Sequence, residues 1–366
     1  MLKFSTPITT KTNFTHTGEP LCSGRSFGAI GDELGYPSLG ISRYNFLRVL
    51  YENLPDHETK VKANAHAVKI ETGEDGVQVH LEDGTVEYGS MVIAADGVHS
   101  PARQLIQNLL GDSNAKSPMI PGYLSLFAHT REIREDVVLG DFAESHGPGI
   151  ASQCARMNDV MYFTVLKRLD EPPKDKKKFT SEDVHKFANE ISEVTIFPGI
   201  KLKEIWPLRE DGSATLLYQE EGMAQKWYHG RIVLVGDSAH KMTSVSGQGA
   251  LAAALSAVVL VNKLRVQLQR KPDPSTKDLE ATFAMYMLWR KEAVTEVLGF
   301  GAMLSRFITW ANPGYEAVDR LSTSESMLAD MKRKIVPGLS QSPVLDFVPF
   351  KSKRGTTPWT MYCEPA

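Results

Sequence analysis

The sequence feature that most restricts the fold is the stretch from Arg231 to Leu264, in which a short strand pattern runs into a long apolar helix pattern. Four apolar residues, Ile232 to Val235, predict a strand that is buried on both faces. The strand pattern ends at Gly236-Asp237, and an Ala, Leu and Val run that starts at Gly249 predicts a buried helix of about four turns. This arrangement favours an α/β fold and places a carboxylate near free helix N–H groups.

Taken alone, this stretch also fits an ordinary core strand and core helix joined by a loop. Gly247-Gln248-Gly249 resembles part of a dinucleotide fingerprint, but that fingerprint requires its glycines to follow the strand directly. Eleven residues separate Val235 from Gly247 here. The prediction of a ligand site therefore depends on agreement from other parts of the chain.

Length and charge restrict the class of function. The chain has 366 residues, which favours two domains, and its 41 Lys and Arg nearly balance its 44 Asp and Glu. Because no sustained basic stripe is interleaved with aromatic residues, we expect no nucleic-acid partner. Three cysteines lie far apart, which favours reduced thiols in a cytoplasmic protein, and no metal-ligand spacing is present.

The apolar runs are short. The first residues lack the apolar centre of a signal peptide. The longest apolar run, Ala250 to Val261, is shorter than the roughly 20 residues that cross a bilayer. We therefore expect no transmembrane segment, and peripheral membrane association stays open.

The first 60 residues predict one clear element. Residues 1–40 are rich in Thr, Gly, Ser and Pro and predict loops with at most one short strand. Ser42 predicts the N-cap of an amphipathic helix that ends before Pro55. Arg43 lies in the first turn, where a cation opposes the helix dipole, so it is either solvated or faces an anion.

A second strand ends in the same way as the first. Residues 61–90 predict a β-meander with tight turns, and the meander leads into an apolar strand, Met91 to Ala95. This strand ends at Asp96-Gly97 and is followed by a helix pattern. Two such strand ends in one sheet can converge on one ligand.

The middle of the chain has a different pattern. Within residues 118–228, aromatic and aliphatic clusters at 123–130 and 160–166 predict strands of a second, mostly antiparallel sheet. Gly147-Pro148-Gly149 follows no predicted strand, so we interpret it as a turn rather than a glycine fingerprint. Residues 274–311 predict one or two amphipathic helices.

Three motifs and one further segment together resemble the flavin-dependent aromatic-hydroxylase superfamily, and most closely its fungal secondary-metabolite monooxygenases and epoxidases. Asp96 to Arg103 matches the D-G-x-x-S-x-x-R motif, and Gly236 to His240 matches G-D-A/S-A-H. Gly247 to Ala250 matches G-Q-G-A, and Gly35 to Arg43 resembles the segment whose arginine contacts FAD.

The resemblance implies a role for each matched residue. Arg43 would contact FAD, Asp237 would hydrogen-bond ribityl or ribose hydroxyls, and Ala250, beside Gly249 at the helix start, would lie against the isoalloxazine. Asp96 belongs to the motif tied to FAD and NADPH binding. The resemblance implies no catalytic side chain, because NADPH reduces FAD and O₂ then forms a flavin C4a-hydroperoxide that oxidises an electron-rich ring or alkene.

The implied fold is α/β, with a doubly wound, Rossmann-like FAD-binding domain, an inserted and mostly antiparallel β-sheet substrate domain, and C-terminal helices. The predicted limits are 1–117 and 229–270 for the FAD domain, 118–228 for the substrate domain, and 271–366 for the helices and tail. The family's initial G-x-G-x-x-G strand–helix unit has no match, so we expect an N-terminally incomplete FAD domain with exposed apolar edges.

The expected function is FAD-dependent oxidation of a hydrophobic terpenoid, meroterpenoid or polyketide. Two departures weaken the expected polar contacts with the flavin, because Leu251 replaces an asparagine and Leu255-Ser256 replaces an acidic pair. A degenerate or non-oxidative relative that binds a metabolite or a partner protein is therefore the alternative. An unrelated Rossmann-like NAD enzyme is disfavoured by the misplaced glycines.

Overall fold

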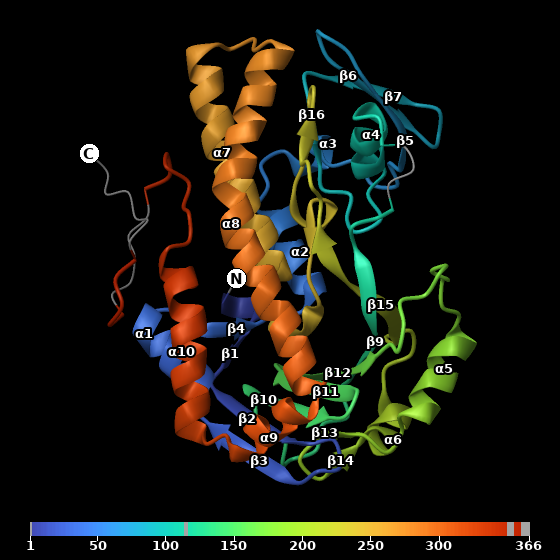
Figure 1. Ribbon diagram of the computed structural model, residues 1–366, viewed down its shortest axis with the longest axis vertical. Helices are drawn as coiled ribbons and strands as arrows, with labels where there is room; N and C mark the ends of the chain where they lie inside the picture. The colour runs from blue at the N-terminus through green and yellow to red at the C-terminus, as the bar shows by residue number, and fades with distance from the viewer. Residues whose placement is uncertain (1, 113–115, 350–354, 360–366) are drawn as a thin grey trace.

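The chain forms a mixed α/β structure with a large sheet at one end and a small three-stranded mixed sheet, flanked by long helices, toward the other (Figure 1). The computed structural model describes residues 2–112, 116–349 and 355–359. The predicted mixture of a largely antiparallel sheet with a parallel strand pair is therefore present.

The large sheet has eight strands in the order β18-β15-β9-β12-β11-β10-β2-β3. Its neighbouring strands are antiparallel except for β10 and β2, which are parallel. The strands are β2 (Thr10–Thr15), β3 (Pro20–Gly24), β9 (Ile120–Thr130), β10 (Asp141–Gly147), β11 (Ile150–Met157), β12 (Val160–Arg168), β15 (Thr215–Met223) and β18 (His240–Lys241).

One face of this sheet carries the largest apolar core, in which Leu126 and Phe163 pack with Phe187 and Ile196. The covering elements are α5 (Ser181–Glu190), β13 (Thr195–Phe197), β14 (Ile200–Lys201), α6 (Leu202–Ile205) and the 3-10 helix η2 (Trp206–Leu208). Tyr123 belongs to a separate apolar cluster that contacts the end of the longest helix. The sheet is therefore covered by apolar side chains on both sides.

Residues 1–40 contain more structure than the sequence predicts. The expectation of loops is wrong, because this part forms η1 (Leu2–Phe4), β1 (Thr6–Ile8), β2, β3, α1 (Ser26–Leu34) and β4 (Ser38–Gly40). Strand β2 has a polar sequence, TKTNFT, but its Lys11 faces a buried carboxylate, Glu144, across the sheet. The domain limits stay a prediction, and β2 and β3 join residues 10–24 to the sheet formed by residues 118–228.

The small sheet contains both predicted strand ends. β17 (Ile232–Leu234) lies between β16 (Tyr228–His229) and β8 (Val92–Ala94), and it is parallel to β8. β8 forms the edge, and its Ile93 is 48% exposed, as expected for an uncovered apolar edge. The meander precedes β8, and a helix follows it: β5 (Ala67–Thr72), β6 (Val77–Leu81), β7 (Val86–Gly89) and α4 (Pro101–Leu109).

Long helices connect the two sheets (Figure 1). α7 (Gly249–Arg270) packs against α8 (Thr276–Ile308), which is a single helix of 33 residues that reaches the large sheet. The remaining helices are α2 (Arg43–Glu52), α3 (His57–Lys60), η3 (Gly236–Ser238), η4 (Ser244–Ser246), α9 (Pro313–Leu321) and α10 (Ser324–Ser340).

α7 is longer than the apolar run predicts. Among the described residues it is the one helix whose length and composition would suffice to cross a membrane. In this fold one side of it, with Ala252, Val259 and Leu260, is buried in the core around β17 and α8.

Candidate functional site

The two predicted strand ends lie side by side. β8 and β17 are parallel neighbours in which Ala94 is opposite Leu234, and the Val235 N–H donates to the Ala94 carbonyl at 3.0 Å. Asp96 follows the first strand and Asp237 follows the second, so both carboxylates belong to loops at the same edge of the sheet. The prediction that these strand ends converge is confirmed.

A buried arginine holds the two loops together. Arg103 donates from Nη1 to the Ser238 carbonyl at 2.8 Å and from Nη2 to the Val98 carbonyl at 2.5 Å. The Ser238 hydroxyl in turn donates to the Ala94 carbonyl at 2.7 Å. Arg103 is the last residue of the D-G-x-x-S-x-x-R motif, and in this fold its guanidinium joins the D-G loop to the G-D loop.

Asp96 has a local structural contact. Its Oδ2 accepts a hydrogen bond from the Ala102 N–H at 3.1 Å, in the first turn of α4. Ser100 caps the same turn through the Arg103 N–H at 2.9 Å. Asp96 is solvent-exposed, and its contact with a cofactor stays a prediction.

Asp237 is paired and only partly covered. Its Oδ2 accepts from Nζ of Lys241 at 2.9 Å, and its side chain is 37% exposed. Its Oδ1 receives no hydrogen bond from another residue that the structure describes. The carboxylate is thus oriented by Lys241 while one oxygen stays available for a ligand hydroxyl.

The loop before Asp237 requires glycine. Gly236 has φ +69°, and a Cβ at this position would lie 3.0 Å from the Cβ of Ala253 in α7. The left-handed backbone and the close approach together exclude a larger residue without rearrangement. This packing places the Asp237 loop against the first turns of α7.

The start of α7 lacks a capping side chain. Its N-cap residue is Gln248, whose side chain makes no cap hydrogen bond, and Gly247 before it has φ +65°. Gly249 and Ala250 form the first helical positions, and Ala250 is exposed. The first-turn N–H groups and the positive end of the helix dipole can therefore receive acceptor atoms of a ligand.

Arg43 lies on a separate element. The predicted N-cap is confirmed, because the Ser42 hydroxyl accepts from the Asn45 N–H at 3.1 Å. Arg43 is exposed at the first position of α2, a helix without a buried residue, and within the described part of the chain no hydrogen bond or ion pair joins its side chain to Asp96 or Asp237. Its cofactor contact stays a prediction.

His240 is a core residue. Its Nε2 lies 3.1 Å from the Ser256 hydroxyl, and its ring packs on Trp227 at 5.3 Å between centroids. Burial, with the nearby Arg290 guanidinium, lowers the pKa of His240 to about 4, so its ring is neutral at pH 7. These contacts assign His240 to packing beneath the loop.

The sequence does not predict a buried charge cluster in the large sheet. Nζ of Lys11 lies 2.6 Å from Glu144 Oε1, and His146 Nε2 lies 3.0 Å from the same oxygen. His146 Nδ1 lies 2.7 Å from Oδ2 of Asp319, to which the Trp310 indole N–H also donates at 2.7 Å. These residues come from β2, β10 and the α8–α9 corner, so no spacing in the sequence could reveal the cluster.

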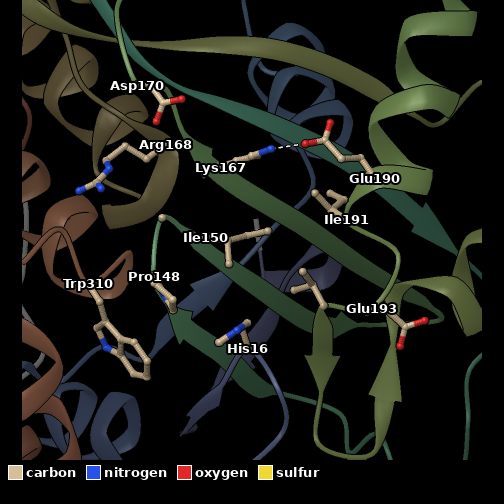
Figure 2. Close-up of a pocket in the computed structure, with 12 residues that line it drawn as sticks. His16, Pro148, Ile150, Lys167, Arg168, Asp170, Glu190, Ile191, Glu193 and Trp310 are labelled. Carbon is tan, nitrogen blue, oxygen red and sulfur yellow. Dashed lines mark hydrogen bonds and ion pairs between the residues drawn. The ribbon is translucent and has the colours of Figure 1, made fainter.

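A cavity of about 490 Å³ lies apart from the strand ends, beside the turn between β10 and β11 (Figure 2). Trp310, Ile150 and Arg168 line it, and Lys167 forms an ion pair with Glu190 at its rim. None of the predicted cofactor residues lines this cavity. The turn at residues 147–149 is confirmed, but the expectation that no strand precedes it is wrong, because β10 ends at residue 147.

Comparison with known proteins identifies the family. Residues 37–278 match the family described as FAD binding domain. The chain is 30% identical over 370 residues to the FAD-dependent monooxygenase srdH of Neurospora crassa, covering 94% of this chain and 82% of that protein. It is 29% identical over 346 residues to the FAD-dependent monooxygenase paxM of Penicillium paxilli, covering 91% of this chain and 71% of that protein.

Solved structures share the fold. HpxO from Klebsiella pneumoniae, complexed with FAD and uric acid, aligns with a TM-score of 0.72 and 20% identity over 91% of this chain and 81% of that chain. A salicylate hydroxylase substrate complex aligns with a TM-score of 0.65 and 18% identity over 91% of this chain and 81% of that chain. The chain thus belongs to the FAD binding domain family and is an FAD-dependent monooxygenase.

Proposed function

We propose that this monooxygenase uses NAD(P)H and O₂ to hydroxylate or epoxidise a hydrophobic secondary metabolite of the terpenoid, meroterpenoid or polyketide class. The observation that carries the proposal is the pair of parallel strand ends, with Asp237 beside the uncapped start of α7. Fungal relatives named FAD-dependent monooxygenases support the reaction class. When bound, FAD supplies the redox and oxygen-transfer chemistry.

The residues of this edge fit the flavin and ribityl part of FAD. Gly236 lets the backbone approach α7 closely, and Asp237 keeps one oxygen open for a hydroxyl. The N–H groups at Gly249 and Ala250 suit the acceptor atoms of the flavin ring. Among the described residues no strand is followed directly by a G-x-G-x-x-G turn. The fit therefore covers the flavin and ribityl part of FAD.

In this proposal the protein groups bind and orient rather than react. Asp237, held by Lys241, accepts a hydrogen bond from a ribityl or ribose hydroxyl, and Arg43 contacts the cofactor as a cation. Tyr123 of β9, Val245 of η4 and Ile308 of α8 belong to a buried apolar cluster where the large sheet meets α8. An apolar boundary of this kind excludes water and suits a hydrophobic substrate.

One observation favours the alternative of a non-oxidative, metabolite-binding or partner-binding relative. Leu251, in the first turn of α7, is 39% exposed at a position where the family resemblance implies a polar flavin contact. An apolar side chain there offers the flavin no hydrogen bond. We place this alternative second, and we propose a cytoplasmic location for either function.

The proposed function is tested with purified chain that has been incubated with FAD. NADPH oxidation, O₂ consumption and product mass are measured with terpenoid, polyketide and aromatic candidates. The proposal predicts substrate-dependent NADPH oxidation and a product that has gained one oxygen atom. Bound FAD without oxidation of NADPH under any condition would support the alternative.

A further inference from the structure

The segment between β18 and α7, residues 243–248, is held by two glutamine side chains from the large sheet. Gln219 of β15 accepts the Ser244 N–H at its Oε1, at 2.9 Å. Gln153 of β11 donates from its Nε2 to the Val245 carbonyl, also at 2.9 Å. The two glutamines thus hold successive backbone groups of η4, one as an acceptor and one as a donor.

The Gln153 amide has a second, charged partner. Its Nε2 also donates to Oε2 of Glu144 at 2.7 Å. Glu144 is 1% exposed, and its other oxygen contacts Lys11 and His146. Burial acts to raise the pKa of Glu144, but the Lys11 ammonium and His146 outweigh it and lower the pKa, so Glu144 stays ionised. A carboxylate can only accept, so Gln153 must turn its NH₂ group toward Glu144 and Val245.

Thr243 adds a third contact from the helical side. Its hydroxyl lies 2.7 Å from the hydroxyl of Ser305 in α8, and both side chains are buried. The segment is therefore held between the large sheet and α8 at Thr243 to Val245, shortly before α7 begins at Gly249. A shift of η4 would move the first turn of α7, because only Gly247, in the left-handed conformation, and Gln248 separate the two helices.

We propose that Gln153 and Gln219 are positioning residues for the flavin, which fix the 243–248 segment and thereby direct the first-turn N–H groups of α7 toward FAD. This inference rests on the proposed placement of the flavin at the start of α7. The glutamines act through backbone atoms of Ser244 and Val245. Their role therefore depends on donor and acceptor identity, which substitutions can separate.

Four variants separate these roles. Gln153→Glu removes the donor and places a second carboxyl beside Glu144, whereas Gln219→Glu keeps an acceptor for the Ser244 N–H. Gln219→Leu removes that acceptor. Thr164→Val is the matched control, because Thr164 lies opposite Gln153 on β12 and its buried hydroxyl has no partner among the described residues.

The first measurement is the FAD dissociation constant of each variant, from flavin fluorescence without turnover. Loss of one hydrogen bond should raise the constant about five- to tenfold in Gln153→Glu and Gln219→Leu. Gln219→Glu and Thr164→Val should stay within about twofold of the wild-type chain. Equal FAD dissociation constants for all four variants would overturn the inference. A dissociation constant raised as much in Thr164→Val as in Gln153→Glu would overturn it as well.

The second measurement is amide hydrogen exchange of residues 244–251 without FAD. Exchange should accelerate in Gln153→Glu and Gln219→Leu but not in the other two variants, because only those two release the segment. Unchanged exchange in Gln153→Glu would overturn the glutamine roles even if FAD affinity changed. A wild-type chain that binds no FAD but shows this exchange pattern would overturn the flavin placement instead.

Discussion

The Nδ1 atom of His146 lies 2.7 Å from Oδ2 of Asp319, and each side chain is 1% exposed. On the other side of the ring, Nε2 lies 3.0 Å from Glu144 Oε1. Both nitrogens must carry a proton to donate to both carboxylates, so the imidazolium form fits this site. The contact joins β10 to α9, which are 173 residues apart at this pair.

We predict that His146 stabilises the fold more at mildly acidic than at alkaline pH. Burial acts to lower its pKa, but the hydrogen bonds to Asp319 and Glu144 outweigh burial and raise the pKa. A raised folded pKa gives stability that is complete below the unfolded value of about 6.5 and is lost as pH rises through the folded value. Urea unfolding of the wild-type chain and His146→Gln should give a stability difference that shrinks as the pH rises from about 6 to about 9.

The groups that face His146 are Glu144 on its own strand, Asp319 on α9, and the Phe307 ring of α8, with Lys11 of β2 next to Glu144. A stability difference that stays constant over this pH range would contradict the imidazolium assignment. A difference that grows with pH would contradict the direction of the pKa shift.

Asp319→Asn removes a buried charge but keeps an oxygen that can accept from the Trp310 indole. We expect a loss of about 2 kcal/mol of unfolding free energy at pH 7, because a hydrogen bond to a charged group becomes a neutral one. Asp330→Asn on α10 is the control, since its partners Arg333 and Lys334 lie at the surface and such pairs contribute about 1 kcal/mol or less. Similar losses for the two variants would show that the buried position of Asp319 has no special effect.

Gly236→Ala should destabilise the chain and weaken FAD binding together. The new Cβ meets Ala253 at 3.0 Å in a left-handed backbone, which costs about 1 to 3 kcal/mol and moves the Asp237 loop. Gly84→Ala separates backbone strain from steric contact, because Gly84 has φ +86° but a Cβ added there would meet no other atom within 4 Å. Calorimetry should show a larger loss of stability for Gly236→Ala than for Gly84→Ala, and FAD titration should show a larger loss of affinity. Weakened FAD binding in Gly84→Ala would argue against a local effect.

Arg43→Ala should lower FAD affinity without loss of stability. Arg43 is exposed and opposes the dipole of α2, so its removal should change the unfolding free energy by less than about 0.5 kcal/mol. Loss of a charge-assisted contact should weaken FAD binding by about tenfold. Arg48→Ala on the same helix removes an ion pair with Glu52 and is the control, and equal FAD affinity in both variants would remove Arg43 from the site.

The sequence predicts the small sheet well because its strands are apolar runs with glycine at their ends. Both Ile232–Leu234 and Val92–Ala94 form strands, and the Ser42 cap of α2 is present. Strand β2 is not predicted because Phe14 is the one apolar residue in its sequence, TKTNFT, and Lys11 is buried through its ion pair with Glu144. Local sequence cannot report a strand whose burial depends on a charge partner far along the chain.

The same limit applies to the site. The two strand ends that precede Asp96 and Asp237 are predicted to converge, and the parallel pairing of β8 and β17 brings them to one edge of the small sheet. The contacts of Lys241 with Asp237 and of Gln153 with Val245 are not predicted. Gln153 lies 92 residues from Val245, so its role follows from strand order in the large sheet and not from a motif.

The measurement that tests the central claim most directly is the visible absorbance of the purified chain after incubation with excess FAD and gel filtration, compared with Asp237→Ala. We predict flavin bands that co-elute with the wild-type protein and are absent from Asp237→Ala, with both proteins folded by circular dichroism. Flavin retained equally by both would contradict the assignment of Asp237 to the site. A folded wild-type chain without flavin bands would contradict the claim that the β8 and β17 strand ends, with the start of α7, bind FAD.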